Sequence, residues 1–282
     1  MILITGGAGR LGFEVVKLLV AQGEKVRVFD LPNINWSHLE ALSSVTTFKG
    51  DITNSDHVHH ACEGARGVIH LAALMPPRSE ADESLTHMVN VVGTINLLKN
   101  IEKGTPVVFS SSISVYGVTP GERKPIDELH SLTPHDSYSK TKILGEKIVS
   151  KSGNPYTILR ISPIAVADLV ELPSIIPYRA DQRVEFIFVE DAARAIVGAL
   201  QLVGEKETFN VAGGDSWQML GHQYIEGFYE ALGVEVDPKY SEEFTAVHWY
   251  DTSKGRRIKY QSTSFELFEE RLKAIGDEYG LR

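Results

Sequence analysis

Cysteine is almost absent from this chain of 282 residues, in which Cys62 is the only one. A single cysteine cannot form an intrachain disulfide and cannot build a cysteine-based metal site, so we expect neither. The scarcity of cysteine fits a reducing compartment. We therefore predict a cytoplasmic protein without a metal centre.

Long hydrophobic runs and an excess of positive charge are also missing. The apolar stretches at 15–21 and 192–200 are far shorter than the about 20 residues of a membrane-spanning helix. The N-terminal MILITGGAGRLG starts directly with a strand-like run, so we expect no signal peptide. The formal net charge of −9 argues against nucleic acid and anionic membranes as partners.

The chain does contain a regular alternation of β-branched runs and amphipathic stretches. Such alternation is typical of βαβ units on a parallel sheet, and it predicts an α/β fold with a doubly wound parallel sheet. We expect strands at Met1–Thr5, Val26–Asp30, Val45–Lys49, Gly67–Leu71, Val107–Ser110 and Tyr156–Ile161. We expect helices at about 9–22, 54–63, 81–101 and 138–151, the last ended by the glycine and proline of GNP at 153–155.

The rhythm changes after residue 162. A proline-marked segment at 163–177 is followed by a strand running into a helix at 186–200, and then by helices at about 216–232 and 264–277. We predict one domain at 1–162 and a cap made mostly of 163–282, with 185–212 returning to the sheet domain.

A glycine loop stands between the first expected strand and the first expected helix. The segment TGGAGRLG places glycines at 6, 9 and 12. Glycines at this spacing allow a tight turn, let the backbone approach a pyrophosphate and bring the helix close to the strand. The helix N-terminus then faces the negative charge. The loop therefore predicts dinucleotide binding.

Two acidic residues follow the glycine loop, one at the end of the second expected strand and one just after the third. Asp30 ends the strand VRVFD, near the position about 20 residues after the glycines where a carboxylate holds the adenosine ribose hydroxyls. A carboxylate there repels a 2′-phosphate, and residues 31–33 offer no cation, so NAD is favoured over NADP. Asp51, in FKGDI, is placed either to cap the helix at 54 or to meet the adenine amino group.

Tyr138 and Lys142 lie four residues apart and so share one helix face. The strand before them ends in FSSS, which brings Ser112 to the same edge of the sheet. A lysine ammonium and a positive nicotinamide ring lower a tyrosine pKa from its usual value near ~10 toward neutrality. We predict that Tyr138 moves the proton and Ser112 binds the substrate oxygen while the cofactor takes hydride. A second pair, Tyr250 and Lys254, has no serine strand before it and is expected to be a chance occurrence.

These motifs follow one another in a characteristic order. They are TGGAGRLG, Asp30, Asp51, HLAA at 70–73, NVVGTINLL at 90–98, FSSSISVYG at 109–117, YSKTK at 138–142 and FVEDAARA at 188–195. In this order the chain resembles the extended short-chain dehydrogenase/reductase family, in particular its NAD-dependent epimerase/dehydratase branch, up to about residue 214. The resemblance implies a Rossmann domain that binds NAD and a small C-terminal substrate cap. It also implies a homodimer through the helices near 81–101 and 138–151.

The resemblance also assigns residues to roles. It implies that Ser112, Tyr138 and Lys142 are catalytic. The positions expected around NAD are Gly6, Gly9, Arg10, Leu11, Gly12, Asp30, Asp51, Ile52, Leu71, Ala72, Ala73, Asn90, Ser110, Tyr138 and Lys142.

Residues after the catalytic serine separate the reactions of this family. Nucleotide-sugar dehydratases carry an Asp-Glu pair there, whereas this chain has Ile113 and Ser114, so we expect no dehydration. The strand FSSSISVYG resembles that of UDP-galactose 4-epimerases. We predict NAD-dependent chemistry at a sugar hydroxyl, in first place nucleotide-sugar 4-epimerisation. The alternative is a dehydrogenase or reductase of a smaller sugar, sugar acid or hydroxy acid that releases NADH.

Substrate residues are expected in the cap and at the rim of the sheet, besides Ser112. Pro163 stands where such epimerases carry an asparagine, and the segment 164–185 is short, which suits a smaller substrate. Arg179 and Arg183 lie in that segment, either as a clamp for a diphosphate or sugar carboxylate or as exposed surface residues. Met75 follows the fourth strand and is expected at the rim, where contact with substrate stays open.

Overall fold

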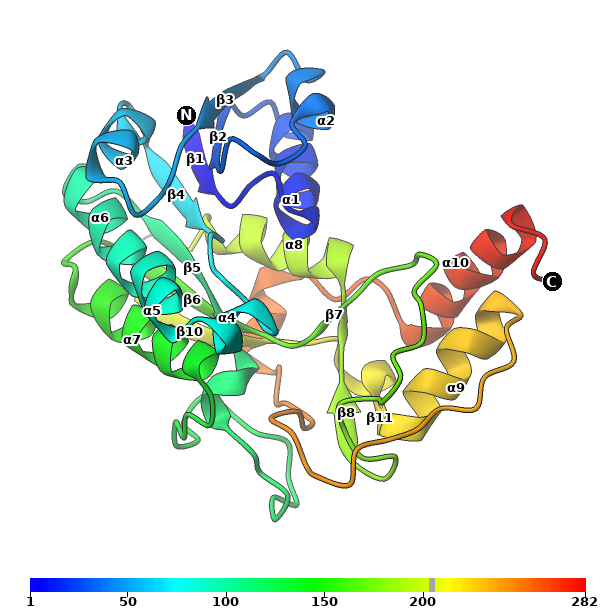
Figure 1. The fold of residues 1–282 in the computed structure, drawn as a ribbon. Helices are drawn as coiled ribbons and strands as arrows, with labels where there is room; N and C mark the ends of the chain where they lie inside the picture. The colour runs from blue at the N-terminus through cyan, green and yellow to red at the C-terminus, as the bar shows by residue number, and fades with distance from the viewer. Residues whose placement is uncertain (203–205) are drawn as a thin grey trace.

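A seven-stranded sheet in the order β3-β2-β1-β4-β5-β6-β10 forms the centre of the computed structural model, which describes residues 1–202 and 206–282 (Figure 1). Neighbouring strands pair in parallel throughout. The strands are β1 Ile2–Thr5, β2 Val26–Asp30, β3 Val45–Lys49, β4 Gly67–His70, β5 Val107–Ser112, β6 Tyr156–Ile161 and β10 Glu207–Val211. The order reverses between β1 and β4, where open α/β sheets form their ligand crevice at the carboxyl edge.

Helices cover both faces of the sheet, which confirms the doubly wound fold (Figure 1). One face carries α1 and α8, and the other carries α3, α6 and α7. The helices are α1 Arg10–Ala21, α2 Ser37–Glu40, α3 Ser55–Cys62, α4 Arg78–Ala81, α5 Glu83–His87, α6 Gly93–Asn100, α7 Ser137–Lys151, α8 Val189–Ala199, α9 Gly221–Leu232 and α10 Phe265–Glu278. In the part of the chain that the structure describes, no helix has the length and apolar character needed to cross a membrane.

Three segments differ from the sequence-based expectation. The helix expected at 81–101 is divided by a π-helical turn at Met88–Val92. The helix expected at 216–232 begins only at residue 221, because Gln218–Leu220 form strand β11 and pair with the cap strand β8, Arg183–Glu185. Strand β5 continues two residues beyond the expected end, so Ser112 is its last residue.

The cap consists of the antiparallel pair β8 and β11 with helices α9 and α10, and it has an apolar core of its own. Aromatic side chains fill this core. For example, the rings of Phe186 and Tyr224 stack with their centroids 3.9 Å apart, and Trp217 is fully buried against Phe268. The short parallel pair β7 Ile164–Ala165 and β9 Ile187–Phe188 lies where the chain leaves and re-enters the sheet region. The predicted division at residue 162 stays a prediction.

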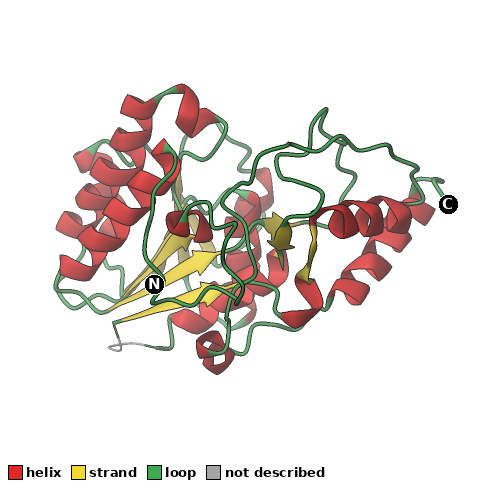
Figure 2. Cartoon of the chain, turned by 90° about the horizontal axis from the view of Figure 1, so that it is seen from below, coloured by secondary structure: helices red, strands yellow, loops and turns green. Residues whose placement is uncertain are grey.

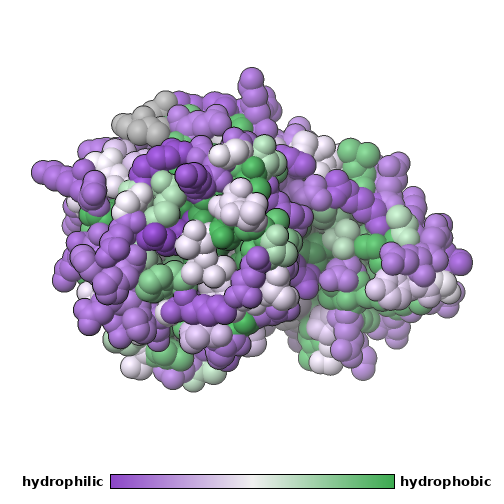
Figure 3. Space-filling model, turned by 90° about the horizontal axis from the view of Figure 1, so that it is seen from above, coloured by the Kyte–Doolittle hydropathy of each residue, from purple (hydrophilic) through white to green (hydrophobic). Residues whose placement is uncertain are grey.

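Seen from below, loops gather between the helices that flank the main sheet and the two long helices of the cap (Figure 2). The opposite view shows that the surface is hollowed between the larger body and the smaller body formed by the cap helices (Figure 3). Apolar atoms line this hollow in places.

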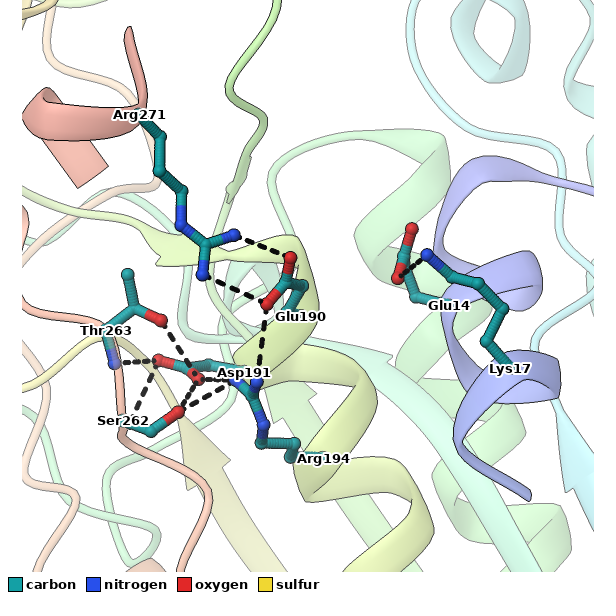
Figure 4. A network of polar contacts seen from close by, with 8 residues as sticks. All are labelled: Glu14, Lys17, Glu190, Asp191, Arg194, Ser262, Thr263 and Arg271. Atoms are coloured by element: carbon teal, nitrogen blue, oxygen red, sulfur yellow. Dashed lines mark hydrogen bonds and ion pairs between the residues drawn. The ribbon is translucent and has the colours of Figure 1, made fainter. Parts of the chain in front are cut away.

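One polar network ties α8 to the segment that precedes α10 (Figure 4). Asp191, buried in the first turn of α8, accepts the backbone N–H groups of Ser262 and Thr263 at 3.1 and 2.9 Å. It also accepts the Ser262 hydroxyl at 2.6 Å. Arg271 of α10 contacts the neighbouring Glu190 at 2.6 Å. The network therefore joins a helix of the sheet domain to the cap.

Replacing Asp191 with Asn is expected to lower the free energy of unfolding by about 2–4 kcal/mol, because buried donors lose a charged acceptor. Urea denaturation followed by circular dichroism measures this loss. The matched variant Glu190→Gln, whose partner Arg271 is partly exposed, is expected to cost less than about 1 kcal/mol. Equal losses of unfolding free energy in the two variants would show that the buried hydrogen bonds of Asp191 stabilise the protein no more than the exposed ion pair of Glu190.

Candidate active site

The glycine loop connects β1 to α1. A Cβ atom on Gly6 would lie 2.6 Å from the backbone nitrogen of Ala72, and one on Gly12 would lie 2.6 Å from the carbonyl oxygen of Gly6. Close backbone packing therefore requires these two glycines. A Cβ atom on Gly9 would meet nothing closer than the Gly6 oxygen at 3.6 Å. The open space beside Gly9, at the N-terminus of α1, suits a pyrophosphate.

Arg10 and Leu11 begin α1 directly after this loop. Arg10 Nη1 lies 3.5 Å from Asp168 Oδ2, and both side chains are exposed. Leu11 packs against the main core and against the core of the cap. Both residues thus link the loop to the cap side of the crevice, and their contact with NAD stays a prediction.

Asp30 lies at the carboxyl end of β2, where its carboxylate is held by two backbone amides. Oδ2 accepts the N–H of Ala8 at 3.1 Å and Oδ1 accepts the N–H of Leu31 at 2.8 Å. Burial raises the pKa of Asp30, while these two hydrogen bonds work to lower it. The bond to Ala8 fixes the acid against the glycine loop, and its contact with the ribose stays a prediction.

Asp51 does not cap the helix that follows it. Its Oδ1 accepts the backbone N–H and the hydroxyl of Thr53, both at 2.8 Å. The N-cap of α3 is Asn54, whose Oδ1 accepts the N–H groups of Asp56 and His57. The capping alternative for Asp51 is therefore wrong, because the cap position falls after the turn that Asp51 stabilises. Its contact with the adenine stays a prediction.

Two other predicted NAD residues have structural roles of their own. Ile52 is buried against Gly93, whose Cβ would lie 2.8 Å from the Ile52 Cγ2. Asn90 lies in the π-helical turn; its Oδ1 accepts the Leu74 N–H at 2.7 Å, and its Nδ2 donates to the Leu74 oxygen and the Thr141 hydroxyl, both at 3.0 Å. Asn90 therefore fixes the loop after β4 against α7, the helix that carries Tyr138.

The loop after β4 carries four predicted residues beside the glycine loop. The Leu71 N–H donates to the carbonyl oxygen of Thr5 at 3.0 Å, and the Ala72 N–H lies 3.4 Å from the Thr5 hydroxyl. Ala73 follows, partly buried, and Met75 is 60% exposed. These positions agree with a rim around the crevice, and the roles of the four residues stay predictions.

The structure brings Ser112, Tyr138 and Lys142 together at the carboxyl edge of β5. The Ser112 side chain lies near enough to the Tyr138 hydroxyl to act on its pKa, which it works to lower. Lys142 is buried, and its Nζ lies 5.5 Å from the centroid of the Tyr138 ring. The same Nζ donates to the carbonyl oxygen of Ser110 at 2.7 Å. This Ser110 contact is made by the backbone rather than by the side chain.

The side chains of the site do not by themselves lower the tyrosine pKa. Burial raises the pKa of Tyr138, while Ser112 works to lower it. Burial lowers the pKa of Lys142 to about 8, against the opposing effect of Glu146. His70, from β4, has its pKa lowered to about 3 by burial and by the charge of Lys142, so it is neutral. The predicted joint effect of Lys142 and the nicotinamide ring on the Tyr138 pKa stays a prediction, because in the chain itself burial dominates and raises that pKa.

Sequence reasoning missed Glu80, which stabilises the start of α7. Its two carboxylate oxygens accept the N–H groups of Ser137 and Tyr138 at 2.9 and 3.1 Å. The N-cap residue, Asp136, accepts the N–H of Ser139 at 2.7 Å. Glu80 lies in α4 and reaches α7 only through the tertiary fold, so no local sequence signal reveals it.

Ser162 is a second residue that sequence reasoning missed. It follows β6 directly, at the carboxyl edge next to Ser112 of β5, since Ser112 pairs with Ile161. Its hydroxyl is buried and has no hydrogen-bond partner. A buried hydroxyl without a partner is costly, and a polar ligand group in the crevice would satisfy it. A strand-end serine beside a serine strand was the available signal.

Arg179 and Arg183 have different surroundings. Arg179 is paired with Asp181 through two hydrogen bonds of 2.8 and 2.9 Å. Arg183 donates to the carbonyl oxygen of Arg123 at 2.8 Å and lies over the ring of Trp249. Arg183 also lines a cavity of about 330 Å³ between the cap and the loop at 119–123. Of the two predicted clamp residues, Arg183 lines this cavity and Arg179 does not.

A glycine loop, a ribose-type acid and a Ser-Tyr-Lys set at one sheet edge define a dinucleotide-dependent protein of the short-chain dehydrogenase/reductase type. Residues 2–165 match the NAD dependent epimerase/dehydratase family. The chain belongs to this family, whose members depend on NAD.

Curated relatives include both epimerases and dehydrogenases. A UDP-glucose 4-epimerase of Halalkalibacterium halodurans is 35% identical over 180 residues, which are 59% of this chain and 52% of that protein. The 3 beta-hydroxysteroid dehydrogenase type 7 of Mus musculus is 34% identical over 164 residues, 52% of this chain and 43% of that protein. The chain thus matches about half the length of these relatives.

The fold is also similar to solved structures along nearly the whole chain. The UDP-glucose 4-epimerase of Thermus thermophilus, solved as a complex with NAD, has a TM-score of 0.81 and 23% identity. The likeness covers 99% of this chain and 98% of that one. It confirms the α/β architecture of the sheet domain with its cap.

Proposed function

We propose that the chain oxidises and reduces a sugar hydroxyl with NAD, as a nucleotide-sugar 4-epimerase that recycles its cofactor. The observation that carries this proposal is the meeting of Ser112, Tyr138 and Lys142 at the carboxyl edge of β5. The similarity to an epimerase over the first part of the chain supports the same reaction class.

In this proposal Tyr138 is the general base and acid. The substrate hydroxyl approaches the Tyr138 oxygen, and the Ser112 hydroxyl binds the same substrate oxygen. Lys142, held by the Ser110 carbonyl at 2.7 Å, favours the phenolate through its charge. NAD supplies a hydride acceptor and a positive ring when bound. Because burial raises the pKa of Tyr138, both positive charges are needed for proton transfer near neutral pH.

The residues present fit NAD at three places. The space beside Gly9 admits the pyrophosphate at the N-terminus of α1. The Asp30 carboxylate, fixed by Ala8 and Leu31, binds the ribose hydroxyls. The unpartnered Ser162 hydroxyl lies at the edge where a carboxamide would need a polar partner.

Replacing Asp30 with Ala is expected to weaken NAD binding by about 10–100-fold, since hydrogen bonds to a charged group are worth about 1.5–3 kcal/mol. Affinity for NADP is expected to fall less, because the repulsion of the 2′-phosphate disappears. Isothermal titration with both nucleotides measures the ratio. An unchanged preference for NAD would assign ribose recognition to another residue.

A net dehydrogenase of a smaller sugar, sugar acid or hydroxy acid is the second candidate. It is favoured by the pairing of Arg179 with Asp181, which removes Arg179 from the two-arginine clamp expected for a diphosphate. The similarity to a hydroxysteroid dehydrogenase shows that relatives of this half of the chain include dehydrogenases.

Incubation with catalytic NAD and UDP-sugars separates the two candidates. Interconversion of UDP-glucose and UDP-galactose without growth of NADH absorbance supports the epimerase. Stoichiometric NADH with a non-nucleotide substrate supports the dehydrogenase and contradicts the first proposal.

We further propose a homodimer formed through α5, α6 and α7, within the cytoplasm. Exposed apolar side chains on or next to these helices, Leu85, Met88 and Leu144, support this surface. Sedimentation equilibrium of the wild type and of Leu144→Glu tests it, with a monomeric wild type as the contradicting result.

A further inference from the structure

Glu146 is buried one helical turn after Lys142, on the face of α7 that packs on the sheet. Its Oε1 accepts the Ser111 hydroxyl at 2.6 Å and the Arg160 Nε at 3.0 Å. Its Oε2 accepts Arg160 Nη2 at 2.8 Å. One side chain of α7 is therefore joined to both β5 and β6.

Arg160 is held as firmly as Glu146. Its Nη1 donates to the Tyr116 hydroxyl at 3.0 Å and to the Glu128 carbonyl oxygen at 3.1 Å. The Tyr116 hydroxyl in turn donates to Asn210 Oδ1 of β10 at 2.5 Å. The guanidinium thus has fixed partners on several elements, and the position of Glu146 is determined by the sheet.

Glu146 and Lys142 contact neighbouring residues of the same strand. Lys142 donates to the Ser110 carbonyl oxygen, while Glu146 accepts from the Ser111 hydroxyl. The next residue is Ser112, whose side chain acts on the Tyr138 hydroxyl and works to lower its pKa. The two contacts of α7 therefore set the distance between the tyrosine and the serine that the proposed reaction needs.

The titratable and charged groups around Lys142 belong to three elements, α7, β4 and β6. Glu146 on α7 acts to raise its pKa, against burial, which lowers it to about 8. His70 of β4 is neutral near pH 7, since its pKa is about 3. Tyr138 of α7 is protonated and neutral, because burial raises its pKa. Arg160 of β6 is a further positive charge, and its partner is Glu146.

We propose that Glu146 is a positioning residue of the active site, which fixes β5 beneath Lys142 and keeps the lysine ammonium charged at neutral pH. The catalytic meaning of this role rests on the proposed function, whereas the effect on Lys142 does not. Without the carboxylate, Lys142 would share a buried region with the uncompensated charge of Arg160.

The test is the protonation of Lys142 in Glu146→Gln, in the full chain and without substrate. The pH titration of the Lys142 Cε resonance in ¹³C-lysine-labelled protein, assigned with Lys142→Met, gives the midpoint directly. We expect the midpoint to fall by about one pH unit or more, so that most of the lysine is neutral at pH 8. Glu146→Asp, which keeps the charge, is expected to restore most of the wild-type midpoint.

Two further variants separate positioning from general destabilisation. Glu146→Gln/Arg160→Gln removes both charges together, leaves a side-chain amide at each position, and decides the matter if the single variant does not fold. Asp191→Asn, a buried acid at the cap junction, is the matched control and is expected to leave the Lys142 midpoint unchanged. A wild-type midpoint in both Glu146 variants, or an equal fall in Asp191→Asn, would overturn the proposal.

Activity is read separately, so that the two proposals can fail independently. If the midpoint falls as expected but the wild type converts no sugar substrate, the proposed function fails and the role of Glu146 in protonation stands. If the wild type is active and the midpoint does not move, the role of Glu146 fails alone.

Discussion

Tyr138→Phe is expected to lower turnover by about 10²–10⁴-fold, the usual contribution of a side chain that transfers a proton. The change removes one hydroxyl, which lies beside Ser112 at the carboxyl edge of the sheet. The ring, its packing and the Lys142 ammonium remain. Binding of NAD is therefore expected to stay within about threefold of the wild-type value, because less than about 0.7 kcal/mol is at stake.

Steady-state kinetics and titration with NAD measure the two quantities. Tyr156→Phe is the matched control, since it removes the same hydroxyl at the opposite, amino end of β6. It is expected to leave turnover unchanged. Full activity of Tyr138→Phe would show that another group moves the proton, and an equal loss in both variants would indicate a folding defect.

The pH dependence of the reaction follows from the same geometry. The ammonium of Lys142 has a pKa of about 8 in the chain, so its charge is complete well below pH 8 and is lost as the pH rises through this value. The support that it gives to the phenolate is lost in the same direction. Turnover is therefore expected to decline above about pH 8, as a pH–rate profile would show.

The strands of the sheet domain could be predicted because buried parallel strands are continuous β-branched runs. Six expected strands agree with the structure to within two residues. Strand β10 was not separately predicted, because it pairs only with β6 at the sheet edge and begins with the half-buried Glu207 and Thr208. Strand β11 falls within the helix expected at 216–232, because its pairing with β8 is a tertiary contact that the local pattern does not contain.

The residues of the candidate site also fall into those that local sequence spacing indicates and those that depend on tertiary contacts. The glycine loop, Asp30, and the pair Tyr138 and Lys142 have fixed spacings, so the sequence alone could indicate them. The second pair shows the limit of spacing: Lys254 lies 2.6 Å from Glu207 and donates to the Thr208 carbonyl, so its ammonium is held by β10 rather than by the serine strand. Its partner tyrosine is buried against another ring. Spacing identifies a candidate, and the strand beside it identifies the site.

Residues that act across elements could not be found from spacing. Glu80 reaches α7 from α4, and Glu146 meets Arg160 only because α7 packs on β6. The different surroundings of Arg179 and Arg183 could not be predicted either, because Arg179 pairs with Asp181 and Arg183 lines the cavity only in the folded chain. These contacts arise when the sheet and cap assemble.

Substitutions of two glycines of the loop are expected to have different effects, one on NAD affinity and the other on stability. Gly9→Val is expected to weaken NAD binding on the order of 100-fold, about 2.7 kcal/mol, because the side chain fills the space that the pyrophosphate needs. Stability is expected to fall by no more than about 1 kcal/mol. The backbone of Gly9 is extended, with φ −70° and ψ 167°, and a Cβ there meets nothing within 3.5 Å.

Gly12→Ala is expected to give the opposite pattern. Its Cβ would lie 2.6 Å from the Gly6 carbonyl oxygen and from the Gly7 Cα, and backbone atoms cannot turn aside as a flexible side chain does. The free energy of unfolding is expected to fall by about 1–3 kcal/mol or more. Thermal unfolding and NAD titration of both variants check the contrast. If Gly9→Val binds NAD as the wild type does, the pyrophosphate lies elsewhere, and the crevice between β1 and β4 is not the cofactor site.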